Sequence, residues 1–238
     1  MVTIVFTREP IVGVSKTRLV PRLGPENAAA LADAFAHDAM GKARIIGAPI
    51  IIAGSAPAGT GGSRYFRRLA RRFGARLADQ GDGTLGARMA RVLEPYRAQG
   101  AVLFGTDSPS LPVQLLRHSI ALLHRFPVVL GPSLDGGYYL IGVRGAMPDV
   151  FRGVRWGGPQ VLRQTIARLE RAGVRYALGP AWYDVDRWSD VLLLAAHLRQ
   201  MLKAQNGKLR TAGSRWAAPS RTTPCPGTVR ILARLGLV

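Results

Sequence analysis

Short apolar runs alternate with helical patterns along most of this chain. The expected strands are residues 2–6, 50–53, 101–104, 128–130, 138–143 and 175–178. Between them, apolar side chains recur at helical spacing, which predicts helices at residues 25–43, 63–73, 83–96, 112–126, 159–172 and 189–202, the last with Ser189 as its N-cap. Such alternation is typical of α/β proteins. We therefore expect a three-layer α/β/α sandwich around a mainly parallel mixed sheet.

The periodic pattern stops near residue 205 and divides the 238-residue chain into two parts. Residues 1–204 are long enough to bury one sizeable core, so we expect a single domain there. Residues 205–238 form a tail rich in Arg and Pro, most of which has the composition of a linker. Its last ten residues can form a short amphipathic helix with Ile231, Leu232 and Leu235 on one side. That helix would dock either on the domain or on a second copy of the chain in a homodimer.

Cysteine usage and hydropathy favour a cytoplasmic location. The single cysteine, Cys225, excludes an internal disulfide framework. No apolar run reaches the roughly 18 residues that a membrane span needs. The first residues are typical of a strand and lack the pattern of a signal segment.

The net charge of +19 raises the hypothesis of a nucleic-acid partner. Only four of the 33 basic residues are lysines, so a general arginine bias explains the charge without such a partner. The densest basic group is Arg64, Arg67, Arg68, Arg71, Arg72 and Arg76. Apolar residues share one face of this predicted helix, so the arginines first indicate a solvated face. A non-catalytic module that binds RNA or another anion is the alternative.

One carboxylate stands where a buried strand ends. Asp107 follows the apolar residues 101–104, and in open α/β sheets ligands bind beyond the carboxyl ends of the strands. Asp107 is therefore a candidate catalytic residue. The alternative is a cap for the next helix or a local turn with Ser108.

The loop after the first expected strand carries several cations. Gly13 gives the turn flexibility, and Arg8, Lys16 and Arg18 can converge on a phosphate. It is not a P-loop, because Ser15 stands where that motif has glycine. An ordinary basic surface loop is the alternative.

Two further segments place carboxylates beside flexible or extended backbone. Asp135 precedes Gly136 and Gly137, which would let the backbone approach a ligand closely; a plain hairpin turn is the alternative. Asp184 and Asp186 fall on one side of an extended segment. Paired oxygen ligands suit Mg²⁺ or Mn²⁺, and helix capping is the alternative.

Five motifs in order resemble the bacterial DUF2064 family over about residues 1–200. They are Gly13-x-x-Lys16-Thr17-Arg18-Leu19, Gly81-Asp82-Gly83-x-Leu85-Gly86-x-Arg88-Met89, Gly105-Thr106-Asp107-Ser108-Pro109, Gly131-Pro132-x-x-Asp135-Gly136-Gly137-Tyr138-Tyr139-Leu140-Ile141-Gly142 and Asp184-Val185-Asp186. Members are often described as glycosyltransferases of arsenosugar biosynthesis or as selenodomain-associated glycosyltransferases. The family is similar to the nucleotide-diphospho-sugar transferase (GT-A) superfamily, which also holds guanylyltransferases.

The resemblance implies a GT-A-like fold and a set of site residues. Asp107 and Asp186 match the positions that hold Mg²⁺ or Mn²⁺ in those relatives. The remaining implied residues are Arg8, Gly13, Lys16 and Arg18 at the donor phosphates, Gly83, Leu85, Gly86 and Arg88 around the nucleotide, and Gly136, Gly137, Tyr138 and Trp156 on the acceptor side. Lys16 and Asp135 join Asp107 as candidate catalytic residues, with Asp135 as general base or acceptor-orienting carboxylate.

The implied activity is metal-dependent transfer from a nucleotide-activated donor to a small-molecule acceptor. A glycosyltransferase would use a nucleotide sugar and release a nucleoside diphosphate. A nucleotidyltransferase, the alternative, would use a nucleoside triphosphate and release pyrophosphate. The chain departs from the family pattern at Trp156, which Gly157 and Gly158 follow in place of Ser-Thr, and at Arg187, which replaces Thr.

Overall fold

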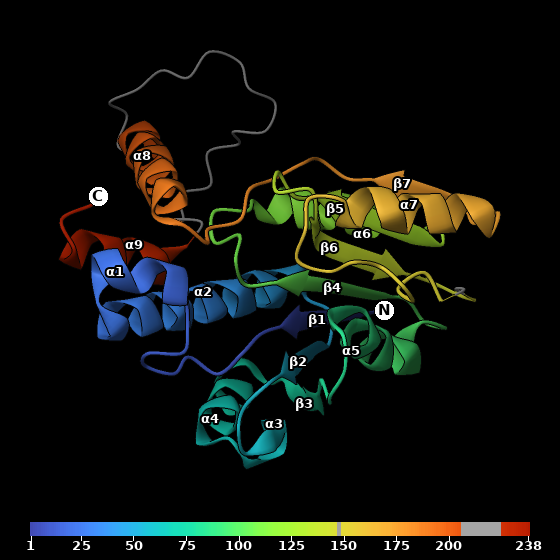
Figure 1. Cartoon of the computed structure of the whole chain (residues 1–238), viewed down its shortest axis with the longest axis horizontal. Coiled ribbons are helices and arrows are strands. Elements are labelled where there is room, and N and C mark those ends of the chain that lie inside the picture. Colours follow the sequence, from blue (N-terminus) through green and yellow to red (C-terminus); the bar gives the residue numbers. More distant parts are fainter. Residues whose placement is uncertain (147–148, 206–224) are drawn as a thin grey trace.

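A seven-stranded sheet forms the centre of the protein in a computed structural model that describes residues 1–146, 149–205 and 225–238 (Figure 1). In spatial order its strands are β3 (Arg76–Asp79), β2 (Ile50–Gly54), β1 (Val2–Phe6), β4 (Ala101–Gly105), β6 (Tyr138–Val143), β5 (Val128–Pro132) and β7 (Tyr176–Leu178). All neighbouring pairs are parallel except those that β6 makes with β4 and β5. The predicted mainly parallel mixed sheet is confirmed.

Helices cover both faces of this sheet. The longer ones are α2 (Pro25–Ile46), α4 (Arg64–Phe73), α5 (Leu85–Leu93), α6 (Val113–Leu122), α7 (Val161–Arg171), α8 (Trp188–Gln205) and α9 (Pro226–Arg234). Single turns form α1 (Val20–Leu23) and α3 (Gly59–Gly62), and 3₁₀ turns form at Thr17–Leu19 and Glu94–Tyr96.

Side chains alternate between two apolar cores because successive strand residues point to opposite faces. Val5 packs with residues of α2, α4 and α6, whereas Ile4 packs with residues of α5 and α7. The three-layer sandwich follows from this alternation. In α4 the apolar residues Phe66 and Leu69 are buried and the arginines lie outside, as the sequence predicts.

Two local features differ from the prediction. β3 was not predicted, because its four residues are too few to show a strand period and its position at the sheet edge leaves Arg76 and Asp79 exposed. Ser189 is not the N-cap of α8, which begins at Trp188. The Asp190 carboxylate instead accepts the backbone N–H groups of Asp186 and Arg187.

The C-terminal helix packs on the domain of its own chain. A third apolar cluster joins α2, α8 and α9, with Leu232 and Cys225 fully buried in it (Figure 1). Asp38 of α2 accepts hydrogen bonds from the backbone N–H groups of Gly227 and Thr228 and from the Thr228 hydroxyl. Helix α9 begins three residues earlier than the predicted amphipathic segment. Within the described parts of the chain, no helix is long and apolar enough to cross a membrane.

Candidate functional site

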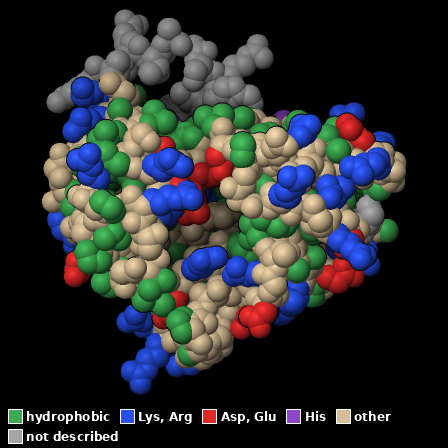
Figure 2. Space-filling model, viewed as in Figure 1, with side chains coloured by type: hydrophobic (Ala, Val, Ile, Leu, Met, Phe, Trp, Pro, Cys, Tyr) green, Lys and Arg blue, Asp and Glu red, His purple; other side chains and the backbone are tan. Residues whose placement is uncertain are grey.

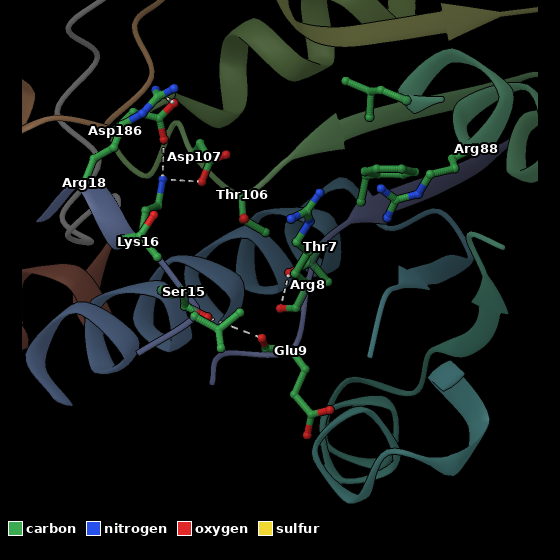
Figure 3. Close-up of a pocket in the computed structure, with 15 residues that line it drawn as sticks. Thr7, Arg8, Glu9, Ser15, Lys16, Arg18, Arg88, Thr106, Asp107 and Asp186 are labelled. Carbon is green, nitrogen blue, oxygen red and sulfur yellow. Dashed lines mark hydrogen bonds and ion pairs between the residues drawn. The ribbon is translucent and has the colours of Figure 1, made fainter. Parts of the chain in front are cut away.

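A cleft of about 580 Å³ opens beyond the carboxyl ends of β1 and β4 (Figures 2 and 3). Five segments contribute to it: the loop after β1, helix α2, helix α5, the loop after β4 and the segment before α8. Its charged lining consists of Arg8, Glu9, Lys16, Arg18, Arg88, Asp107 and Asp186. Figure 2 shows this hollow with acidic side chains on one wall and basic side chains around it. Cations and carboxylates therefore share one opening, and we call it the main cleft.

Lys16 joins the two predicted metal ligands directly. Its Nζ lies 2.6 Å from Asp107 Oδ1 and 2.8 Å from Asp186 Oδ1 (Figure 3). It also donates to the Val185 carbonyl oxygen at 2.7 Å. Arg18 lies farther out, 3.9 Å from the second Asp186 oxygen. The Lys16 side chain is only 9% exposed, whereas the two carboxylates are about half exposed. A buried cation thus bridges two carboxylates that also face the cleft.

The charges of this triad shift each other's pKa values. Burial acts to lower the pKa of Lys16, but the Asp107 and Asp186 carboxylates outweigh it and raise that pKa above its ordinary value. Burial acts to raise the pKa of Asp186, and the Lys16 ammonium outweighs it so that the pKa falls. Lys16 and Asp186 therefore stay charged over a wide pH range.

The fold of the first loop aims Lys16 at these oxygens. The Ser15 hydroxyl accepts the Ile11 backbone N–H at 2.8 Å and so closes the loop. Lys16 itself has a left-handed backbone with φ of 49°, the only positive φ of a non-glycine residue in the described ranges. The fully buried Leu19 then anchors the following 3₁₀ turn in the core. A non-glycine residue in this conformation is strained, and such strain gathers at functional sites.

A further carboxylate, Asp184, connects the loop after β4 with the loop after β5. It accepts hydrogen bonds from the hydroxyls of Ser108 and Ser133, the latter at 2.6 Å. Burial raises the pKa of Asp184, with a further contribution from the Asp107 charge. Asp184 and Asp186 were predicted as a pair on one side of an extended segment, and in the structure they have different partners. Asp186 meets Asp107, the other residue of the metal pair implied by the resemblance, through Lys16.

Gln80 organises the basic side of the main cleft. Its side-chain amide donates to the carbonyl oxygens of Thr7 and Ala53, and its Oε1 accepts from the Arg88 guanidinium. Arg88 also lies over the Phe6 ring at 5.6 Å, and burial lowers its pKa. Sequence reasoning missed Gln80. Its position directly before the motif that starts at Gly81 was the available signal.

Gly86 and Trp156 contact each other rather than the main cleft. A Cβ atom on Gly86 would lie 2.5 Å from the Trp156 ring, so the glycine lets α5 pack closely against this indole.

Gly83, with φ of 108°, precedes Thr84, whose hydroxyl caps α5. Leu85 lines the cleft, while Gly13 provides a left-handed turn, with φ of 77°, just before the cleft-lining residues Val14 and Ser15.

Asp135, Gly136 and Gly137, which were predicted near the acceptor, form a turn before β6. The Asp135 carboxylate is exposed and accepts the Gly137 backbone N–H at 2.9 Å, and it is not among the side chains that line the main cleft. Gly136 has φ of 88° and leaves no room for a side chain against the Pro159 backbone. This is the geometry of the plain turn that the sequence left open. Tyr138 lines a smaller chamber of about 200 Å³.

That smaller chamber adjoins the main cleft. The two share Phe6, Leu85 and Asp107, and the chamber continues between mostly apolar side chains toward β6. Asp184 and Ser108 lie at its polar end. A ligand group held near Asp107 would thus have an apolar compartment next to it.

The donor set of the main cleft fits a hard divalent cation. Asp107 and Asp186 offer carboxylate oxygens that converge on one cationic centre, since each contacts the Lys16 ammonium. Mg²⁺ is commonly held by one or two carboxylates together with substrate phosphates and water. In the described ranges no group of three or more His, Cys, Asp or Glu side chains could hold a metal alone. Phosphate oxygens and water would complete the coordination.

The comparisons with known proteins agree with this fold. The family model described as an uncharacterized protein conserved in bacteria (DUF2064) matches residues 42–158. A protein from Desulfovibrio desulfuricans G20, provisionally assigned as a nucleotide-diphospho-sugar transferase, is 26% identical in sequence. Its structure superposes with a TM-score of 0.76 over 99% of this chain and 95% of that one. A search of curated proteins gave no match.

Two nucleotide-using enzymes share the fold at lower identity. One is CMP:2-keto-3-deoxy-manno-octonic acid synthetase in complex with CTP, with 12% identity and a TM-score of 0.50 over 84% of this chain and 98% of that chain. The other is the inositol-1-phosphate CTP transferase from T. maritima, with 14% identity and a TM-score of 0.50 over 79% and 90%. The fold is thus that of nucleotide-diphospho-sugar transferases and nucleotidyltransferases.

Proposed function

Because residues 42–158 belong to the DUF2064 family and the whole chain has the fold of nucleotide-diphospho-sugar transferases, we propose that this protein transfers a group from a nucleotide-activated donor. The observation that carries the proposal is the main cleft, where four basic side chains and three carboxylates, Asp107 and Asp186 among them, lie at the carboxyl ends of β1 and β4. Ligand sites of open α/β sheets lie at this edge. The finer assignment is glycosyl transfer from a nucleotide sugar to a small-molecule acceptor.

The basic side chains bind the donor phosphates in this proposal. Arg8, Lys16, Arg18 and Arg88 all line the main cleft, and a phosphate chain carries the charge they complement. Positive charge fixed in a cleft also stabilises the negative charge that develops on a leaving diphosphate. These residues would therefore bind the donor and promote departure of the leaving group.

Asp107 and Asp186 hold Mg²⁺ or Mn²⁺ in this proposal. Such a cation, when bound, acts as a Lewis acid that neutralises charge on the leaving phosphates. The two aspartates keep their carboxylates beside one another through the backbone hydrogen bond from Val185 to Asp107. Their half-exposed side chains leave oxygen atoms open to the cleft.

The acceptor would lie on the Tyr138 side, in the small chamber that adjoins Asp107. The indole of Trp156 packs edge-on against the ring of Tyr138, and the turn at Asp135, Gly136 and Gly137 directly precedes Tyr138. Asp135 would serve as general base only if a bound acceptor reaches its exposed carboxylate.

Nucleotidyl transfer is the second candidate. The observation that favours it is the number of cations around the cleft, because four basic side chains suit a triphosphate as well as a sugar diphosphate. In that reaction an acceptor oxygen attacks the α-phosphate and pyrophosphate leaves.

Thermal-shift measurements with Mn²⁺ test the proposal and separate its two forms. We expect nucleotide sugars or nucleoside triphosphates to raise the melting temperature of the wild type. Asp107→Asn should abolish this shift, whereas Glu94→Gln, a matched change of an exposed carboxylate outside the cleft, should keep it. If no nucleotide of either class stabilises the wild type, the proposal is wrong. Release of a nucleoside diphosphate or of pyrophosphate, followed by ³¹P NMR, then assigns the reaction.

A further inference from the structure

The Lys16 ammonium has three oxygen neighbours, one for each of its protons. They are a carboxylate oxygen of Asp107, a carboxylate oxygen of Asp186 and the carbonyl oxygen of Val185, all within 2.6 to 2.8 Å of Nζ. An ammonium group has three hydrogen-bond donors and no acceptor. Lys16 thus fills the space between the carboxylates and uses all its hydrogen-bonding capacity there.

This arrangement opposes the binding of a divalent cation at the same carboxylates. Two cations sharing one pair of carboxylates repel each other, and the repulsion is strong because the Lys16 side chain is shielded from water. The ammonium also occupies oxygen lone pairs that a metal ion would need.

Lys16 also lacks a proton to offer to a phosphate while it remains in this position. Arg8 and Arg18 line the cleft from the same loop, and the Arg18 side chain is 65% exposed, so arginines can make the first contact with an incoming phosphate. An anion held by these arginines would offer the Lys16 ammonium new oxygen acceptors.

We propose that Lys16 is a built-in counter-cation that keeps divalent metal away from Asp107 and Asp186 until a phosphate-bearing ligand draws its ammonium into the cleft. The idea rests on the proposed function, since it describes how the same cleft takes up its metal and its donor. Its consequence is that metal and phosphate bind cooperatively, because each is favoured by the displacement of Lys16.

The test measures Mn²⁺ affinity by electron paramagnetic resonance without nucleotide. Lys16→Met should bind Mn²⁺ at least about tenfold more tightly than the wild type, because an adjacent charge shifts such equilibria by one order of magnitude or more. Lys203→Met, the same change at an exposed lysine on α8, should leave the affinity unchanged. The tighter site should vanish in the double variant Lys16→Met, Asp107→Asn. Equal or weaker Mn²⁺ binding by Lys16→Met overturns the proposal, and so does a tighter site that survives in the double variant.

Inorganic phosphate provides the second arm. It should tighten Mn²⁺ binding to the wild type, after correction for Mn²⁺ complexed in solution, and should give no such gain in Lys16→Met. A gain of equal size in both proteins overturns the coupling.

The wild type provides a measurement that does not depend on the folding of a variant. The chain has only four lysines, so the ¹⁵N-edited ammonium signals can be assigned individually. The Lys16 signal should change when Mg²⁺ and inorganic phosphate are added together and change less with either alone. A signal that both additions leave unaltered overturns the proposal.

These outcomes are distinct from those of the proposed function. Tighter Mn²⁺ binding by Lys16→Met together with no response to any nucleotide supports the cation exchange and rejects the donor. If nucleotides stabilise the wild type but Lys16→Met leaves the Mn²⁺ affinity unchanged, the nucleotide-activated donor is supported and the cation exchange is rejected.

Discussion

The backbone N–H of Val185 donates to the carbonyl oxygen of Asp107 at 2.8 Å. This bond joins the loop after β4 to the segment before α8, and it places Asp107 beside Asp186. Lys16, from the loop after β1, then bridges the two carboxylates. The site is therefore assembled from three segments that are distant in sequence.

The Lys16 and Asp186 pair should stabilise the protein over a defined pH range. The pKa of Asp186 is lowered, so its contribution is present above the ordinary value of 3.8 and is lost as the pH falls through the lower folded value. The pKa of Lys16 is raised, so its contribution is present below the ordinary value of 10.5 and is lost as the pH rises through the higher folded value.

Asp186→Asn should accordingly lower the free energy of unfolding by about 1 kcal/mol between those limits, a small value because the carboxylate is half exposed. Urea unfolding at several pH values measures this difference, with Glu94→Gln as the surface control. A difference that persists unchanged at pH 3 would contradict the assignment.

Gly86→Ala should destabilise the fold. The new Cβ would lie 2.5 Å from the Trp156 ring and 2.7 Å from the Phe151 Cβ, so we expect a loss of about 1 to 3 kcal/mol in the free energy of unfolding. Gly41→Ala is the matched control in α2, because nothing lies within 4 Å of its added Cβ. That change should stabilise the protein by about 0.5 to 1 kcal/mol. Chemical denaturation measures both free energies of unfolding. Equal values for the two variants would refute the packing role of Gly86.

Leu232→Ala should weaken the docking of α9. The side chain is fully buried against α2 and α8, so its truncation should cost about 2 to 5 kcal/mol. Leu193→Ala, at an exposed leucine of α8, should cost far less. Calorimetry gives the melting temperatures, and hydrogen exchange shows whether protection is lost first in α9. Equal melting temperatures for the two variants would mean that α9 adds little to the domain.

Gln80→Ala should affect both stability and ligand binding. It removes the amide that bridges the carbonyl oxygens of Thr7 and Ala53 and leaves Arg88 without its acceptor, which should cost about 1 to 2 kcal/mol. Nucleotide-dependent stabilisation should also weaken, because Arg88 would no longer be fixed over the main cleft. Gln80→Glu, which keeps an acceptor for Arg88 but cannot donate to either carbonyl, separates the two effects. If nucleotides stabilise both variants as much as the wild type, Gln80 does not contribute to nucleotide binding.

Much of the fold was predictable because strand and helix periods are local properties. Residues 2–6 and 138–143 were predicted with the bounds that β1 and β6 have in the structure. Helix ends were less predictable, since they depend on local hydrogen bonds: Ser189 looks like a cap for α8, yet it lies inside the helix, and Asp190 bonds back to the N–H groups of Asp186 and Arg187 before it. The edge strand β3 was missed because pairing with β2, rather than its own composition, makes it a strand.

The candidate site was predictable only in its parts. Arg8, Lys16, Arg18, Leu85, Arg88, Asp107 and Asp186 were named from the sequence and all line the main cleft. The direct contact of Lys16 with both aspartates was not predicted, because no local pattern reports a bond between distant loops. Gly86 and Trp156 were assigned to different ligands, and in the structure they pack on one another.

The sequence by itself determined the alternation of strands and helices and therefore the layered fold, because side-chain periodicity decides which face of each element is buried. It also determined that basic loops and carboxylates follow the strands. Only the tertiary structure decided which of these charges meet. Asp107, Asp186 and Lys16 become neighbours because β1 and β4 are adjacent in the sheet and the segment before α8 returns to the same edge, a relationship set by topology and long-range packing.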